Sequence, residues 1–161
     1  MNWILSARES IGVKGKDKGR IVSLGILIST TFLIVNSISR LFFGGVFSGF
    51  SFSLVYGFIQ QTMVGFGEET IWRGYIQTRL VAHSGTVKGL IVTSVLFAVL
   101  FHFPKSYYES SGVLLEALAS ASIRLFSGLL FGYTMLRSQN IVPSSIFHLF
   151  WNWSGLLWKS S

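Results

Sequence analysis

Seven polar or ionisable side chains lie within long apolar stretches of this 161-residue sequence. We expect one of them, Arg124, to balance the acidic residues or to reach an interface. A charged side chain in the middle of a membrane helix costs about 2.5–3.5 kcal/mol on insertion scales, so such residues are functional candidates by default. Their types could activate a water molecule and stabilise a negative oxygen, which is the chemistry of peptide-bond hydrolysis. The candidate catalytic residues are Glu68, Glu69, Arg73, His102, His148 and Asn152.

The residue types also suggest a role for each side chain. We expect Glu68 to take a proton from the water and His102 to help position that water. We expect His148 and Asn152 to donate hydrogen bonds to the developing negative oxygen. The set therefore predicts an endopeptidase that requires no cofactor.

Several other protease classes lack their residues in this chain. Cysteine is absent, so there is no thiolate nucleophile. The one aspartate is Asp17, which excludes an intramembrane protease built on two aspartates. Neither an HExxH metalloprotease motif nor a GxSxG nucleophile elbow is present.

Two alternatives remain open. The acidic and histidine side chains are acceptable zinc ligands, and a catalytic zinc site typically uses three protein ligands plus water. The zinc ligands would come from Glu68, Glu69, His102 and His148. The other alternative is a catalytically idle membrane protein, for instance an immunity protein that binds a peptide or another membrane protein.

Helical spacing indicates which of these side chains share a face. Glu69 and Arg73 are four residues apart with the acid first, which is the better order for a helical ion pair. Glu68 points about 100° away, so it is free to face other helices while Arg73 holds Glu69 ionised. His148 and Asn152 are also four residues apart and lie on one face.

A helical hairpin brings Glu68 and His102 to the same depth. Glu68 lies 17 residues before Gly85, and His102 lies 17 residues after it. At 1.5 Å per residue, both side chains are about 25 Å from the turn. In an apolar layer about 30 Å thick, they lie towards the face opposite the turn.

The composition indicates an integral membrane protein that is all-α. Half the residues are hydrophobic, 12% are charged and the mean hydropathy is +0.58, values outside the range of soluble domains. GxxxG spacings at Gly45 with Gly49 and at Gly128 with Gly132 would allow helices to approach closely. The expected architecture is a bundle of about six transmembrane helices, over residues 21–37, 41–56, 58–82, 89–103, 113–136 and 143–158.

The charge distribution predicts a basic arm over residues 1–20 and one membrane domain over residues 21–161. Five of the thirteen Lys and Arg residues fall in the arm, which is typical of a cytoplasmic juxtamembrane segment. We expect a multi-pass protein of the cell membrane with a cytoplasmic N-terminus, contacting lipids and no nucleic acid. Six spans would place Lys105 and Lys159 on the side of the arm. The other side would carry Arg40, Arg79, Lys88 and Arg137.

Three short motifs resemble those of one known family. EETIWRG at residues 68–74 looks like an EExxxR(G) motif, His102 follows a Phe-rich apolar run, and HLFWN at residues 148–152 matches HxxxN. Together they resemble the CPBP family, which comprises CAAX-protease and bacteriocin-processing membrane proteins and is also called the Abi family. The resemblance covers roughly residues 60–157. One departure is that the second motif is usually FxxxH. Position 98 is Ala here, and Phe97 is one residue too far upstream to replace the Phe.

The resemblance implies a glutamate-dependent intramembrane protease. In the prenyl-protein branch of the family, the substrate is a C-terminal CaaX motif whose last three residues are released after prenylation. Bacterial members are linked to bacteriocin self-immunity and peptide maturation. Peptides or prenylated proteins are thus the expected partners, and the sequence leaves the oligomeric state open.

Overall fold

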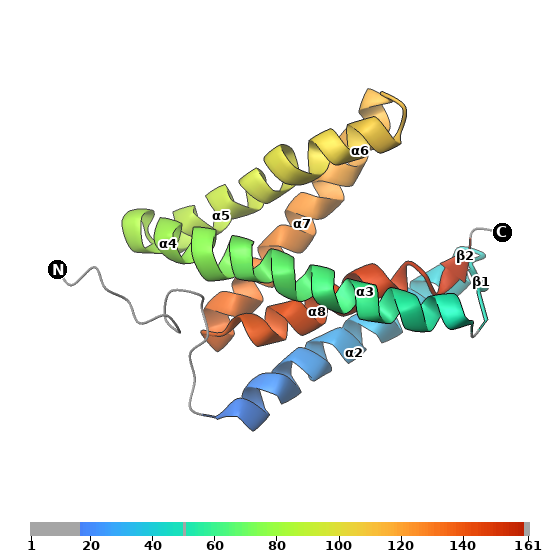
Figure 1. Cartoon of the computed structure of the whole chain (residues 1–161), viewed down its shortest axis with the longest axis horizontal. Helices are drawn as coiled ribbons and strands as arrows, with labels where there is room; N and C mark the ends of the chain where they lie inside the picture. The colour runs from blue at the N-terminus through green and yellow to red at the C-terminus, as the bar shows by residue number, and fades with distance from the viewer. Residues whose placement is uncertain (1–16, 50, 160–161) are drawn as a thin grey trace.

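Helices make up almost all of the chain that the structure describes (Figure 1), which confirms the all-α class. The structure is a computed structural model, and it describes residues 17–49 and 51–159. Most of the predicted basic arm therefore lies outside the described residues. The helices are α2 (Lys18–Phe42), α3 (Phe52–Glu69), η1 (Thr70–Gln77), α4 (Thr78–Ser84), α5 (Thr86–Leu96), η2 (Phe97–His102), α6 (Phe103–Glu109), α7 (Leu114–Ser138) and α8 (Ile141–Ser154), and the two short strands are β1 (Val46–Phe47) and β2 (Trp158–Lys159).

Two of the long helical stretches contain a π-helical segment. α3, η1 and α4 follow one another without a break, and so do α5, η2 and α6. In a π-helix the hydrogen bonds run between residues five apart, and such segments are frequent at functional sites. Both segments lie directly beside candidate catalytic residues, η1 after Glu69 and η2 ending at His102.

Within the described residues, three helical stretches are long and apolar enough to cross a membrane. They are Gly19–Phe42, Thr86–Glu109 and Leu114–Ser138. α8 has 14 residues, which at 1.5 Å each is short of an apolar layer about 30 Å thick. The prediction of about six spans is therefore not confirmed.

The separate helix predicted over residues 41–56 is wrong. α2 continues to Phe42, and the chain then turns through Gly44 and Gly49, whose φ angles are 79° and 77°. Glycine adopts such positive φ angles without steric cost, and here it ends the helix. β1 pairs with β2 in this connection, so the Gly45 to Gly49 spacing is not a helix-packing motif.

Because residues 41–56 do not form a separate span, the basic residues are distributed between the two ends of the bundle differently from the six-span expectation. The start of α2 abuts the start of α8, since a Cβ atom added at Gly25 would lie 2.9 Å from Cα of Pro143. The α4–α5 turn lies at this end as well, to the left in Figure 1. The expected placement of Arg79, Lys88 and Arg137 opposite the start of α2 is thus wrong.

The opposite end of the bundle carries the remaining basic positions. β1 and β2 join the end of α2 to the segment after α8, and the α6–α7 turn lies on the same side (Figure 1). Lys105 and Lys159 therefore lie with Arg40, away from the start of α2, contrary to the six-span expectation.

Glycines on α7 allow its close approach to the helices that carry the site. A Cβ atom at Gly128 would lie 3.3 Å from the ring of Phe97, and one at Gly132 would lie 2.5 Å from Oε1 of Gln77. The close helix packing predicted for Gly128 and Gly132 is therefore confirmed, and it is between helices of the same molecule. α7 lies near enough for its backbone carbonyls to accept hydrogen bonds from η1.

Gly89 is expected to be required for the α4–α5 hairpin, which sets the relative depth of Glu68 and His102. A Cβ atom at Gly89 would lie 2.6 Å from the backbone nitrogen of Val81, so Gly89→Ala forces the two helices apart. Overpacking of this kind costs about 1–3 kcal/mol. Thermal unfolding of the purified protein in lipid should show a lower midpoint for this variant.

Gly67→Ala is the matched control, because a Cβ atom there would meet nothing within 4 Å. Alanine is favoured over glycine in a helix by about 0.8–1.0 kcal/mol, so this variant should keep or raise the midpoint. Equal midpoints for the two variants would contradict the close contact at Gly89.

Candidate active site

Three buried atoms from three helical segments face one another at the centre of the site. Oε2 of Glu68, on α3, lies 3.6 Å from Nε2 of His102 at the end of η2 and 3.8 Å from Nε2 of His148 on α8. None of the three atoms has a hydrogen-bond partner among the described residues. Direct hydrogen bonds of this kind are about 2.7–3.2 Å long, so the three atoms converge without bonding one another, and each is left able to bind a water or substrate atom. The hairpin thus brings Glu68 and His102 together as its equal arms predict.

Glu69 is bound on one oxygen by two partners. Its Oε1 lies 3.2 Å from Nη1 of Arg73 and 3.1 Å from Nδ1 of His148. All three side chains are fully buried. The ion pair predicted between Glu69 and Arg73 is therefore confirmed.

Arg73 also joins η1 to α7. Its Nη2 donates to the carbonyl of Gly128 at 3.1 Å, and its guanidinium lies 4.4 Å from the ring centre of Phe97. One turn later, the buried Gln77 donates to the carbonyl of Gly132 at 3.0 Å. Gln77 was missed in the sequence, although its place four residues after Arg73 in an apolar segment is a signal that could have found it.

The partner of His148 determines what its other nitrogen can do. A carboxylate only accepts hydrogen bonds, so Nδ1 of His148 carries the proton that it donates to Glu69. The Nε2 atom facing Glu68 is then an acceptor in the neutral ring and a donor in the imidazolium. Phe131 stacks on this ring at 4.5 Å and holds its plane.

Phe97 contacts the ring of His102 through the π-helix. The two ring centres lie 4.4 Å apart although the residues are five positions apart. In an α-helix a residue four positions before His102 would share its face, whereas η2 brings the fifth residue there. The expectation that Phe97 is too far upstream for this position is wrong. Ala98, which has the usual motif spacing, is buried beside it.

Asn152 meets Arg124 rather than another member of the predicted set. Nη1 of Arg124 donates to Oδ1 of Asn152 at 3.1 Å, which leaves the Asn152 amide group as the free donor. Arg124 also interacts electrostatically with Glu68. Arg124 was expected only to balance the acidic residues or to reach an interface, and its bond to Asn152 was not foreseen.

Among residues 17–49 and 51–159, no group of three or more His, Cys, Asp and Glu side chains is arranged to hold a metal ion. Glu69, one of the four expected zinc ligands, is bound by Arg73 and by Nδ1 of His148 instead. It therefore does not share the space between Glu68 and the two Nε2 atoms.

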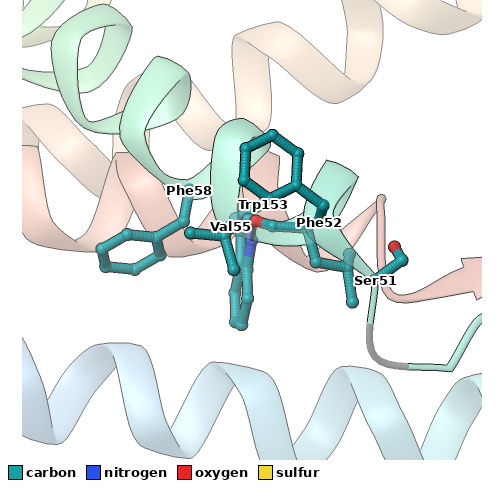
Figure 2. A pocket seen from close by; sticks show the side chains of 6 residues that line it. Ser51, Phe52, Val55, Phe58 and Trp153 are labelled. Atoms are coloured by element: carbon teal, nitrogen blue, oxygen red, sulfur yellow. Dashed lines mark hydrogen bonds between the residues drawn. The ribbon is translucent and has the colours of Figure 1, made fainter.

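An apolar pocket of about 590 Å³ lies on the first turns of α3 (Figure 2). Trp153, which follows Asn152 on α8, forms one wall and donates its indole N–H to the carbonyl of Leu54 at 3.0 Å. The pocket volume is within the range of about 300–1,000 Å³ that is usual for small-molecule sites. The lining residues are Ser51, Phe52, Leu54, Val55, Phe58 and Trp153.

A comparison with protein families gives one match. The family model described as Type II CAAX prenyl endopeptidase Rce1-like matches residues 50–154, which include α3 to α8 and all six candidate catalytic residues. No match to the chain was found among curated proteins or among solved structures.

The Glu69–Arg73 pair is expected to show strong coupling in a double-mutant cycle. Arg73→Gln leaves the Glu69 charge buried without its cation, and breaking a buried pair in this way costs about 3–5 kcal/mol. Glu69→Gln combined with Arg73→Gln removes both charges and should cost less than the sum of the single changes. Unfolding free energies measured in lipid test this, and additive losses would contradict a coupled pair.

Phe97 is expected to matter more than Phe101, which also contacts the His102 ring but is 45% exposed. Phe97→Leu removes the ring between Arg73 and His102, and the lost packing and cation–π contact should together cost about 1–3 kcal/mol of stability. Phe101→Leu should have a small effect. Midpoints of thermal unfolding compare the two variants, and a larger loss for Phe101→Leu would contradict the π-helical register.

Proposed function

Because the chain belongs to the Rce1-like family of type II CAAX prenyl endopeptidases, we propose that it is an intramembrane endopeptidase in which Glu68 activates a water molecule. The observation that carries this proposal is the convergence of Glu68 Oε2 with the Nε2 atoms of His102 and His148, none of which has a hydrogen-bond partner among the described residues. The Rce1-like family is a family of proteases, and the three helices with membrane-spanning length and apolarity agree with a reaction in the membrane.

In the first step, Glu68 removes a proton from the water as the water oxygen attacks the peptide carbonyl carbon. His102 holds the water beside the carboxylate, because its Nε2 atom lies 3.6 Å from Oε2 of Glu68, whereas His148 is an imidazolium throughout and keeps its Nε2 proton for the carbonyl oxygen. A positioned carboxylate can act as general base in this way. The C–O bond forms while the carbonyl electron pair moves to oxygen.

In the second step, hydrogen-bond donors stabilise the tetrahedral oxyanion. Asn152 donates from its amide nitrogen, since Arg124 occupies its oxygen. His148 donates from Nε2 in its imidazolium form, which the Glu69 carboxylate stabilises through Nδ1. Glu68 then gives its proton to the departing amine, the C–N bond breaks, and the two peptides separate.

The proposed substrates are CaaX-type prenylated proteins or other membrane-associated peptides. The family description supports a prenylated substrate. The apolar pocket on α3 adds a place for an isoprenoid chain, because its wall Trp153 follows Asn152 directly on α8. Membrane lipids are the other proposed contacts, in the cell membrane with the N-terminus in the cytoplasm.

The proposal is tested by cleavage of prenylated and unprenylated peptides by the purified protein in lipid. Glu68→Gln keeps the size of the side chain but removes its basicity, and general base catalysis typically contributes about 10²–10⁴-fold to the rate. We expect cleavage to fall by about that factor. His148→Ala should also abolish cleavage, and Glu116→Gln, at an exposed glutamate outside the site, should leave it unchanged.

Adding a chelator and measuring peptide binding distinguish the metal-free protease from the zinc protease and from an idle binding protein. Cleavage that persists with chelator agrees with glutamate chemistry without a metal, whereas loss restored by added zinc favours the zinc protease. A folded wild-type protein that binds peptides without cleaving any member of a broad panel would overturn the proposal in favour of an idle immunity or binding protein.

A further inference from the structure

Arg124 is a cation in the middle of a spanning helix that no carboxylate neutralises directly. It is the eleventh residue of the 25-residue helix α7. Among the described residues it forms no ion pair, and its one hydrogen bond is to the neutral Asn152. Glu68 and Glu109 act on it only at longer range. A charge at this depth is costly, so Arg124 is a candidate functional residue.

The register of α6 against α7 places Arg124 beside the site. The hydroxyls of Ser106 and Ser120 lie 2.8 Å apart across these antiparallel helices. One turn further along each helix lie His102 and Arg124, because each is four residues from its serine. Arg124 is also one turn before Gly128, whose carbonyl accepts from Arg73. Arg124 is thus level with His102, on the face of α7 that lines the site.

Most hydrogen-bonding capacity of the Arg124 guanidinium is unused. The group has five N–H donors, and within the described residues one hydrogen bond is made. None of its nitrogens is among the buried polar atoms without a partner, so the unused donors are not enclosed by the described residues. The side chain is half-buried. This arrangement suits a ligand that enters the site and carries a negative charge.

We propose that Arg124 binds the free C-terminal carboxylate of the peptide substrate. This proposal rests on the proposed endopeptidase function and adds a determinant of which peptides are accepted. The planar guanidinium matches a carboxylate in a two-pronged hydrogen-bonded pair, and such pairs are stronger where water is scarce. By holding the terminus beside Asn152, Arg124 would fix the distance between the chain end and the bond that is cleaved.

Binding tests the proposal independently of cleavage. The parent is Glu68→Gln in lipid nanodiscs, and the probes are one fluorescent prenylated CaaX peptide with a free carboxylate and the same peptide as its carboxamide. A charge-assisted hydrogen bond justifies an expected preference of about tenfold or more for the carboxylate. Adding Arg124→Gln should abolish the preference, Arg124→Lys should keep part of it, and Arg137→Gln, on the same helix but at its end, should keep all of it.

Cleavage assays on the protein with Glu68 intact show whether Arg124 binds the substrate carboxylate or only positions Asn152. Arg124→Gln should raise KM for the carboxylate peptide and leave cleavage of the carboxamide peptide nearly unchanged. An equal loss for both peptides would show that Arg124 acts only through Asn152, and the proposal would be overturned. Equal binding of both peptides by the parent, or a preference that survives Arg124→Gln, would overturn it as well.

The two proposals fail in different ways. A wild-type protein that cleaves both peptides equally retains its endopeptidase function and refutes carboxylate recognition by Arg124. A wild-type protein that cleaves neither peptide, but binds the carboxylate form better through Arg124, refutes the endopeptidase function and supports the recognition. A preference for the carboxylate that disappears in Arg124→Gln supports the role of Arg124 in both cases.

Discussion

The buried ion pair of Glu69 and Arg73 is the interaction on which the rest of the site depends. Both side chains are fully buried, so each must find further partners within the chain. Glu69 binds His148 on α8, and Arg73 binds the carbonyl of Gly128 on α7. Two residues of one helical stretch therefore fix two other helices. The position of Glu68 relative to His148 follows from that arrangement.

The surroundings of the pair reflect the size and charge of a buried guanidinium. Arg73 needs α7 close enough for a backbone carbonyl to reach it, and glycine at position 128 makes that approach possible. The rings of Phe97 and Phe131 lie 4.4 and 5.6 Å from the guanidinium carbon. These aromatic faces stabilise the cation where water does not reach it. The same rings contact His102 and His148, so the packing around the ion pair also orients the site histidines.

Local spacing in the sequence predicted what lies within one helix, and it predicted less well what depends on contacts between helices. The Glu69–Arg73 pair and the equal depth of Glu68 and His102 follow from helical geometry alone. The prediction of a helix over residues 41–56 was wrong because it rested on the apolar residues of this segment, whereas Gly44 and Gly49 adopt positive φ angles and the chain turns there. The predicted placement of Arg79 and Lys88 opposite the start of α2 was wrong for the same reason, since it counted that helix as a span. The partner of Asn152 was missed because Arg124 lies 28 residues away in sequence, and no periodicity records such a contact.

The π-helical turn at η2 has a consequence for how sequences of this kind are compared. Two side chains that meet across it are five positions apart, whereas across an α-helical turn they are four positions apart. Insertion or deletion of one residue at this point can therefore be absorbed by the turn, and Phe97 and His102 stay in contact. A search that requires a fixed gap before the histidine would reject such a chain, although the aromatic ring occupies the same place. Spacing in motifs that contain π-helical turns is best treated as variable by one residue.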